Sequence, residues 1–168
     1  MAIRKIFTYP EKILKKKAAP VKVVDDDVRR LIDDLAETMY AAPGIGLAAN
    51  QVGVAKRVVV VDVTHPDGQP KLYAFVNPEI AARSGEILWE EGCLSFPGIH
   101  VDVDRATHVS VRGLGRDGRP FEMEADDLLA IAIQHEIDHL DGITLADKVS
   151  FLKRKMMVRE LAKAREAS

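Results

Sequence analysis

The chain of 168 residues has a single cysteine, Cys93, which excludes an internal disulfide framework. No apolar run approaches the roughly eighteen residues of a membrane-spanning helix, and charges and Pro10 break the apolar core that a signal peptide would need at the N-terminus. An excess of one charge is also missing, because 24 basic residues nearly balance 26 acidic ones. These absences argue against a membrane or a nucleic acid as the main partner and predict a cytoplasmic protein with a small neutral or peptide-like substrate.

The length and the 47% hydrophobic content predict one domain, residues 1–168. Apolar residues recur at helical spacing from Asp25 to Met39 after three aspartates suited to a helix start, so this segment is expected to be an amphipathic helix. The runs 57–63 (RVVVVDV) and 72–76 (LYAFV), separated by the turn-forming HPDGQP, predict paired strands. Alternating apolar residues at 109–111 and 121–123, joined by GLGRDGRP, predict a hairpin.

Two further helices are predicted in the last third of the chain. Asp126 or Asp127 can cap the first, LLAIAIQHEIDHL, and Gly142 can end it. The second, from about Lys148 to Ala167, has Leu152, Met156, Met157, Leu161 and Ala164 at near-helical spacing. Between residues 152 and 165 it carries six basic side chains and one acid, a local net charge of +5. It is either a solvated surface helix or a docking helix for a polyanion.

The stretch QHEIDHL points to a metal site. Residues four apart on a helix share one face, so His135 and His139 can hold one ion while Glu136 acts as general base on a water. The alternative is a pair of surface or hydrogen-bonded histidines. The residues before His135 are mostly apolar, so both imidazoles are expected to be buried, where they need partners. Asp138 is better interpreted as a structural tie than as a ligand.

A hydrolytic metal site needs a third protein ligand and an open position, and Cys93 in WEEGCLSFPG is the candidate. A lone buried cysteine is otherwise only a small hydrophobe, but the neighbouring Glu90, Glu91 and Ser95 do not suit an apolar core. In GIGLAANQVG, residues 44–53, the glycines and small side chains suggest a backbone that something approaches closely. An ordinary turn is the alternative for that segment.

Taken together, GIGLAANQ (44–51), EGCLS (91–95) and QHEIDHLDG (134–142) resemble the three signature blocks of the peptide deformylases, in the family order. The resemblance runs through the full length of the chain. It implies an α+β fold in which antiparallel β-sheets surround the central helix that bears HExxH, with an N-terminal and a C-terminal helix. It also implies a hydrolase that removes the N-formyl group from the formyl-methionine of newly made polypeptides and releases formate.

By this resemblance Cys93, His135 and His139 are the metal ligands and Glu136 is the acid-base residue. Gln51 and the backbone N–H of Leu94 form the oxyanion site. The resemblance implies one divalent ion, Fe(II) natively, with zinc, nickel or cobalt able to replace it. Substrate peptides are expected to bind as an added strand, with the methionine in an apolar pocket. The residues expected to contact the substrate are Ile45, Gly46, Trp89, Gly92, Leu128, Ile131 and Ala132.

The sequence departs from the family pattern at two positions. His100 replaces an arginine common in the family, which puts contacts of that arginine with the substrate in doubt. Asn50 stands where many relatives have threonine or serine. The resemblance further suggests that Arg105 pairs with Asp138, and that the basic C-terminal helix docks on the ribosome, as in some bacterial relatives.

Two other functions share parts of this sequence pattern. A zinc peptidase that cuts internal amide bonds would use the same HExxH geometry, but its third ligand would have to be an upstream cysteine, and the chain is short for an extended cleft. A non-catalytic relative that binds peptide or ribosome would be expected to have lost one of the site residues. The remaining histidines, His65, His100 and His108, are expected at the surface without a catalytic role.

Overall fold

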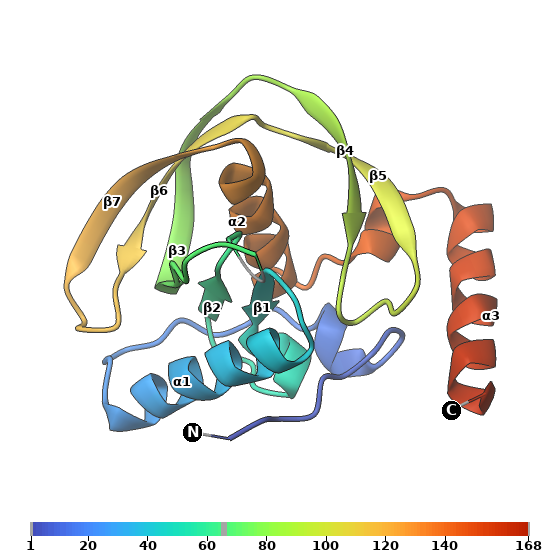
Figure 1. Cartoon of the computed structure of the whole chain (residues 1–168), viewed down its shortest axis with the longest axis horizontal. Helices are drawn as coiled ribbons and strands as arrows, with labels where there is room; N and C mark the ends of the chain where they lie inside the picture. Colours follow the sequence, from blue (N-terminus) through green and yellow to red (C-terminus); the bar gives the residue numbers. More distant parts are fainter. Residues whose placement is uncertain (1, 65–66, 168) are drawn as a thin grey trace.

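The computed structural model describes residues 2–64 and 67–167, and they form an α+β fold with helix α2 (Asp127–Leu140) at its centre (Figure 1). A five-stranded antiparallel sheet has the order β1-β2-β3-β6-β7, and β4 and β5 form a separate two-stranded ribbon. The sheet consists of β1 (Gly46–Ala48), β2 (Val58–Val61), β3 (Tyr73–Ser84), β6 (His108–Leu114) and β7 (Pro120–Asp126), and the ribbon of β4 (Ile87–Gly92) and β5 (His100–Arg105). The predicted fold class is therefore confirmed.

Two short connections join the sheet to the ribbon. Residues 85–86 link β3 to β4, and residues 106–107 link β5 to β6, so the four strands arch over α2 (Figure 1). The amide of Gln134 holds this arch to α2, because it accepts a hydrogen bond from the N–H of Ala106 and donates one to its carbonyl. The arch places the end of β4 opposite one face of α2. The residues that follow β4, 93–98, lie on the same side and are here called the Cys93 segment.

The predicted pairing of the valine-rich run with residues 72–76 is confirmed, with Val59 opposite Phe75. Strand β3 is longer than predicted, because it continues past Pro78 to Ser84 through two register irregularities. The predicted turn HPDGQP begins at His65 and residue 66, which lie outside the described residues, so the expected surface position of His65 is not described. The predicted hairpin is present as β6 and β7, with Val111 opposite Met123.

Helix α1 (Asp26–Ala41) follows the prediction closely. The side chain of Asp25 caps it by accepting a hydrogen bond from the N–H of Val28 at 3.0 Å. Its apolar face, with Leu31 and Leu35, packs in one core cluster with Val58 and Val60 of β2. This packing fixes the turn after α1, which leads into β1.

Helix α2 has the predicted extent but not the predicted cap. Asp126 occupies the N-cap position, yet its side chain makes no capping hydrogen bond. It contacts Nδ1 of His108 at 2.6 Å instead, so the expected cap was wrong because a cross-strand partner competes for the carboxylate. At the other end Gly142 has a φ of +75°, a backbone conformation that favours glycine.

Helix α3 (Phe151–Ala167) lies at one end of the molecule (Figure 1). Met157 and Leu161 are buried in a core cluster with β5 and the 3-10 helix η3 (Leu145–Lys148). Leu152 and Met156 belong to the same near-helical series, but they are 69% and 53% exposed. Helix α3 touches the rest of the chain along only a narrow stripe. Among the described helices, none is both long and apolar enough to cross a membrane.

Candidate metal centre and substrate cavity

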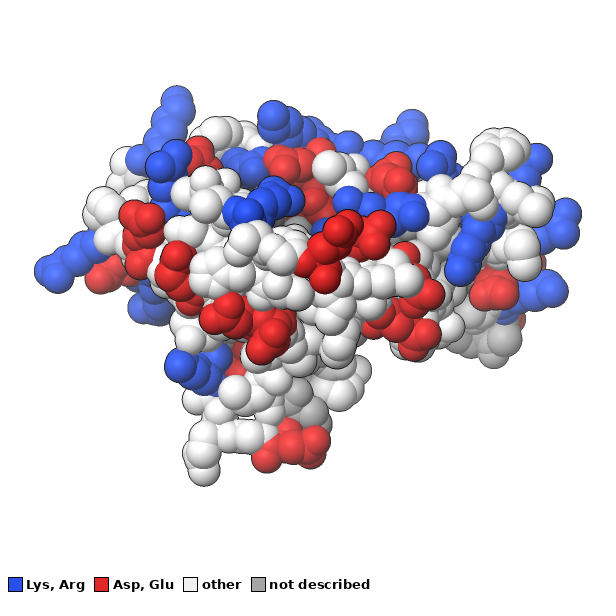
Figure 2. All heavy atoms as spheres, turned by 90° about the horizontal axis from the view of Figure 1, so that it is seen from above, with Lys and Arg blue, Asp and Glu red and all other residues white. Residues whose placement is uncertain are grey.

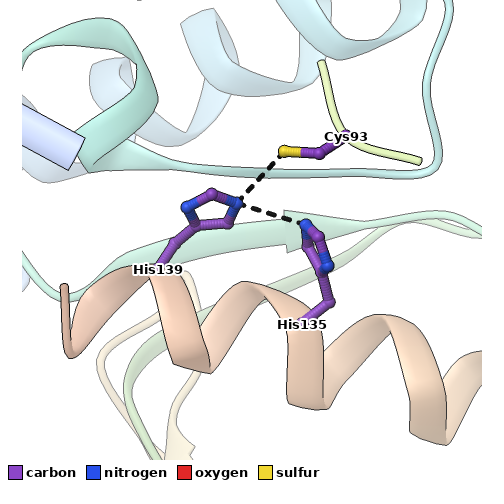
Figure 3. Close-up of side chains that lie close together, drawn as sticks. All are labelled: Cys93, His135 and His139. Carbon is purple, nitrogen blue, oxygen red and sulfur yellow. Dashed lines mark hydrogen bonds between the residues drawn. The ribbon is translucent and has the colours of Figure 1, made fainter. Parts of the chain in front are cut away.

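Three side chains converge beneath the end of β4. Cys93 directly follows β4, and His135 and His139 project from one face of α2 (Figure 3). The Nε2 atom of His139 lies 3.3 Å from the sulfur of Cys93 and 3.2 Å from Nε2 of His135. All three potential ligand atoms lie within 4.8 Å of one another. Both histidines are buried, as the apolar sequence before them predicts.

The spacing of these atoms suits a bound metal ion. In a tetrahedral site with metal–nitrogen distances of about 2.1 Å and a metal–sulfur distance of about 2.3 Å, the ligand atoms are about 3.4 to 3.6 Å apart. A single ring nitrogen carries one proton or one lone pair, so Nε2 of His139 cannot form good hydrogen bonds to both neighbours. Burial lowers the pKa of His139 well below its ordinary value and so favours the neutral ring that binds metals.

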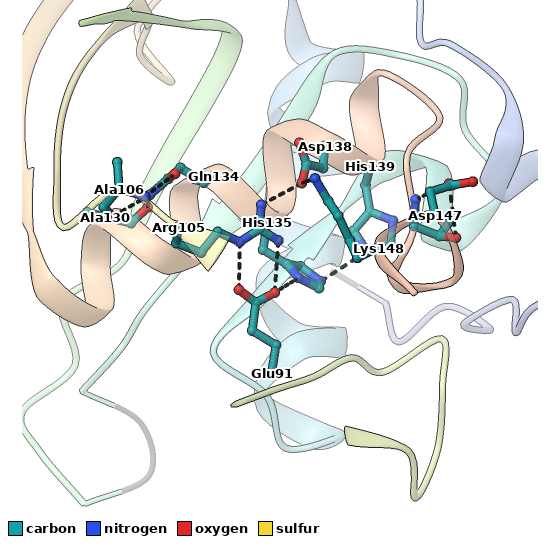
Figure 4. A network of polar contacts seen from close by, with 11 residues as sticks. Glu91, Arg105, Ala106, Ala130, Gln134, His135, Asp138, His139, Asp147 and Lys148 are labelled. Carbon is teal, nitrogen blue, oxygen red and sulfur yellow. Dashed lines mark hydrogen bonds and ion pairs between the residues drawn. The ribbon is translucent and has the colours of Figure 1, made fainter. Parts of the chain in front are cut away.

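Glu91 fixes the orientation of His135. A carboxylate oxygen of Glu91 accepts a hydrogen bond from Nδ1 of His135 at 2.8 Å (Figure 4). This leaves Nε2 of His135 on the side of Cys93 and His139 (Figure 3). The guanidinium of Arg105 donates two hydrogen bonds to the same carboxylate, at 2.6 and 2.9 Å. Burial alone would raise the pKa of Glu91, but Arg105 and His135 outweigh it and hold this pKa at about 2.

Asp138 lies outside the ligand group, on the far side of Arg105. Its carboxylate accepts a hydrogen bond from Arg105 at 2.6 Å and contacts Nζ of Lys148 at 3.4 Å (Figure 4). The predicted pair of Arg105 and Asp138 is therefore confirmed. These ion pairs connect β4, β5, α2 and η3 around His135. Each element therefore limits the movement of the others.

Glu136 is buried beside this group and faces β1. Its Oε1 atom is buried and has no hydrogen-bond partner among the described residues. This oxygen can therefore bind a group outside the protein chain. Burial raises the pKa of Glu136 to about 7, and the charge of Glu91 adds to this increase while that of His135 opposes it. A Cβ atom on Gly46 would collide with Oε2 of Glu136, so only glycine leaves the carboxylate its present place.

Gln51 lies in the 3-10 helix η2 (Ala49–Val52), and its amide reaches towards Cys93. Nε2 donates a hydrogen bond to Oγ of Ser95 at 3.0 Å and lies 3.6 Å from the sulfur of Cys93. Oε1 accepts from the N–H of Ala48, which fixes the direction of the amide. The N–H of Leu94 donates no hydrogen bond to the described residues. Gln51 and Leu94 both line the same cavity.

A cavity of about 660 Å³ opens beside these residues. Its lining includes every residue expected to contact the substrate, namely Ile45, Gly46, Trp89, Gly92, Leu128, Ile131 and Ala132. Strands β1 and β4 border it, and among the described residues each pairs with only one other strand. Each therefore has an open edge. His100 also lines the cavity, so this exposed histidine sits at its rim, whereas His108 is only partly exposed and contacts Asp126.

Sequence reasoning missed some residues of this site. In the sequence Glu91 and Ser95 are recognisable only as polar neighbours of Cys93. In the structure Glu91 binds His135 and Ser95 binds Gln51. Ile6, Pro43, Phe96 and Ile99 also line the cavity. The unusual pair of acids before Gly92 was the available signal for Glu91, because a buried acid needs a buried cation.

Comparison with known proteins identifies the family of this chain. The model of the family described as polypeptide deformylase matches residues 3–155. The chain belongs to the peptide deformylase family. It is 53% identical to the peptide deformylase of Alkalilimnicola ehrlichii over 163 residues, which cover 97% of this chain and 91% of that protein.

Solved peptide deformylases share the whole fold. The enzyme from Legionella pneumophila is 45% identical, with a TM-score of 0.93 over 99% of this chain and 97% of that one. The enzyme from Ehrlichia chaffeensis, solved in complex with actinonin, is 37% identical, with a TM-score of 0.92 over 98% of each chain. As a peptide deformylase, the present chain is a metal-dependent hydrolase that removes the N-formyl group from nascent peptides.

Proposed function

We propose that Cys93, His135 and His139 hold the metal ion of this deformylase, and that residues 1–168 act as a single catalytic domain. The observation that carries the assignment is the convergence of one sulfur and two nitrogens within 4.8 Å of one another. A divalent ion held there would polarise the formyl oxygen and lower the pKa of a water. Glu91 and Arg105 keep His135 in the orientation that this requires.

Glu136 is proposed as the group that moves protons. It takes a proton from the attacking water and then delivers that proton to the nitrogen of the leaving amine, so that formate and a free N-terminus are released. Its burial and its unpartnered Oε1 support this role, because the carboxylate has no competing protein donor at that atom. A pKa of about 7 suits a group that must both accept and donate a proton near neutral pH.

Gln51 and the N–H of Leu94 are proposed to stabilise the negative charge that develops on the formyl oxygen. Both donors border the cavity beside Cys93, and the two hydrogen bonds of the Gln51 side chain hold its amide in place. Donors held in advance lower the barrier because they need little reorganisation, and in other enzymes one such donor contributes about 3 to 4 kcal/mol.

The cavity is proposed to hold the methionine side chain between apolar walls. Ile45, Leu128, Ile131 and Ala132 supply aliphatic surface, and Trp89 lies at the outer margin, where it is 39% exposed. The open edges of β1 and β4 can donate and accept hydrogen bonds to the backbone of an extended peptide, with Gly46 and Gly92 allowing a close approach. His100 at the rim replaces the family arginine as a possible substrate contact.

Replacing Glu136 by alanine is the decisive test of this assignment. We expect Glu136→Ala to retain its metal, measured by elemental analysis, but to lose nearly all formate release from formyl-Met-Ala. Glu122→Ala, which removes an exposed acid from β7, should behave as wild type. Near-normal formate release from Glu136→Ala would refute the role of this residue, and cleavage confined to internal bonds of a longer peptide would favour the peptidase alternative.

The native ion is proposed to be Fe(II), with zinc, nickel or cobalt as possible substitutes. A set of one cysteine and two histidines binds zinc as readily, so the ligand chemistry alone does not select iron. Elemental analysis of protein purified without oxygen is the relevant measurement. A full complement of zinc, with no iron under those conditions, would contradict the assignment of iron.

Helix α3 is proposed to dock on the ribosome, which would place the enzyme in the cytoplasm beside its nascent substrates. Most charged side chains at this end of the molecule are basic (Figure 2), and the segment from 152 to 165 carries a net charge of +5. Phe151, Leu152 and Met156 add exposed apolar surface. Binding that rests on such charges weakens as salt increases.

The docking proposal is tested by cosedimentation with ribosomes at low and high salt. Reversing the charge of Lys153, Lys155 and Arg159 should abolish cosedimentation without changing the hydrolysis of formyl-Met-Ala. The matched control reverses Arg112, Arg116 and Arg119 on the β6–β7 hairpin and should still bind. Equal binding by both triple variants would exclude α3 as the docking element.

A further inference from the structure

Residues 7–9 connect two parts of the site that are far apart in the sequence. The N–H of Phe7 donates a hydrogen bond to the carbonyl of Gln51 at 2.7 Å. The N–H of Tyr9 donates one to the carbonyl of Ser95 at 2.9 Å. Gln51 and Ser95 are separated by 44 positions, yet this one short segment, here called the N-terminal splint, binds the backbone of both.

Side chains hold the splint firmly at both ends. The ring of Phe7 fills the space next to Gly53, where a Cβ atom would lie 2.7 Å from the ring. The ring of Tyr9 is buried and stacks on Phe96 with the centroids 5.0 Å apart, and the N–H of Phe96 donates to the carbonyl of Cys93. Gly53 directly follows η2 and Phe96 belongs to the Cys93 segment. The splint is therefore packed against the same two segments to which it is hydrogen-bonded.

The splint supplies a connection that these two segments otherwise lack. Among the described residues, no backbone hydrogen bond joins residues 49–53 directly to residues 93–98. Their direct polar contacts come from the Gln51 side chain, whose Nε2 atom reaches Ser95 and Cys93. The position of this amide therefore depends on how η2 sits relative to the Cys93 segment, and the splint sets that relation through two backbone hydrogen bonds.

We propose that Phe7 and Tyr9 are positioning residues for deformylation, which hold the Gln51 amide at its working distance from the Cys93 segment. This inference rests on the proposed role of Gln51 in stabilising the charged formyl oxygen. A donor displaced by a fraction of an ångström still binds the ground state, but it stabilises the transition state less. Loosening the splint therefore lowers kcat while KM stays nearly constant.

The first variant is Phe7→Pro, which removes the N–H that binds Gln51. In the metal-loaded enzyme we expect kcat for formyl-Met-Ala to fall by about tenfold or more while KM changes by less than about twofold. Metal content should remain that of wild type. The matched control is Lys22→Pro, because Lys22 is exposed, lies outside the splint, and its N–H donates no hydrogen bond to the described residues. That variant should keep the wild-type kcat.

A second variant covers the case in which proline at position 7 prevents folding. Incorporating the α-hydroxy acid analogue of phenylalanine at position 7 replaces the amide by an ester, so the N–H is lost while the ring remains against Gly53. The same fall in kcat is expected. A fall in kcat that follows a proportional loss of metal would overturn the proposal, because the splint would then act on the metal ligands.

A double-mutant cycle with Gln51→Ala separates this inference from the function on which it rests. If the splint acts through Gln51, Phe7→Pro should cause little further loss in the Gln51→Ala background. If Phe7→Pro lowers kcat by the same factor in the wild-type and Gln51→Ala backgrounds, the proposed role of the splint is overturned. It is also overturned if Gln51→Ala is impaired while the Phe7 variants are fully active. Wild-type activity in Gln51→Ala would instead refute the role of Gln51 itself.

Discussion

Gly46 and Glu136 illustrate how a missing side chain can shape a site. The collision that any Cβ atom at position 46 would make with Oε2 of Glu136 leaves alanine no room unless the carboxylate moves. The backbone of Gly46 belongs to β1, where it is paired with Val61, so the strand cannot easily yield. The second glycine in GIGLAANQ, Gly46, is therefore a steric requirement of the proposed proton-transfer group.

Gly46→Ala should thus reduce turnover while sparing the fold. We expect kcat to fall by about a hundredfold, the size of loss that displacement of a reacting group by about 1 Å can cause. Gly115→Ala is the matched control, because its Cβ atom would mainly meet a flexible aspartate side chain in the β6–β7 turn. Steady-state kinetics and elemental analysis of both variants make the comparison. A kcat close to wild type in Gly46→Ala would mean that Glu136 tolerates displacement.

The candidate residues that the sequence predicted are those whose spacing carries the chemistry. His135 and His139 could be placed together because four residues make about one helical turn. Glu91 and Ser95 could not be recognised in the same way, because their partners Arg105 and Gln51 are distant in the sequence. Only the folded chain brings such supporting contacts together.

Among the elements, the long periodic helices and the valine-rich strand β2 were predictable, whereas β1 and β4 were not. Strand β1 has only three residues, too few to show a period. Strand β4 does not bury its apolar residues and expose its charged ones. Leu88 is 63% exposed, while Glu91 is buried against Arg105. An ion pair inside and a leucine outside remove the alternation by which a strand is recognised.

Asp62 joins three elements immediately after β2. Its buried carboxylate accepts hydrogen bonds from the hydroxyl of Tyr40 at the end of α1, from Thr64, and from the N–H of Lys71 before β3. Burial alone would raise the pKa of Asp62, but these hydrogen bonds outweigh it and lower the pKa below its ordinary value of 3.8. The stability that this group contributes is therefore present above that ordinary value and is lost as the pH falls towards the lowered pKa.

Asp62→Asn should be less stable than wild type at neutral pH, because a neutral amide binds these donors more weakly. Its free energy of unfolding should also fall less steeply than that of wild type below about pH 4. Urea unfolding at several pH values measures both effects. Asp67→Asn, which alters an exposed acid of the same loop, should retain the wild-type pH dependence. Identical pH profiles for Asp62→Asn and wild type would exclude the proposed contribution.

At the scale of the whole molecule, the proposed metal site joins separate parts of the interior. Cys93 packs with the cluster that contains Phe96, Leu145 and Leu161, whereas Ile133 and Ile137 of α2 belong to another cluster. An ion bound to Cys93, His135 and His139 would thus link two regions of the core. Ligands that bind only the folded state stabilise it by mass action.

Removing the metal should consequently lower the melting temperature. An ion at a hundredfold excess over its Kd contributes about 2.7 kcal/mol, which for a chain of this size corresponds to a shift of about 5 to 10 °C. Adding zinc or nickel to the metal-free protein should restore the shift in wild type and in His100→Ala, but much less in Cys93→Ser. Calorimetry measures these shifts. A full shift in Cys93→Ser would remove the sulfur from the proposed ligand set.

The open edges of β1 and β4 bear on how many different chains one enzyme can serve. Main-chain amide and carbonyl groups are the same in every polypeptide, whatever its side chains. A protein that binds its substrate through those groups, and is selective only for the side chain of the first residue, acts equally on nascent chains of unrelated sequence. Breadth across a whole proteome can thus arise from two strands that each leave one edge unpaired, rather than from a large or adaptable surface.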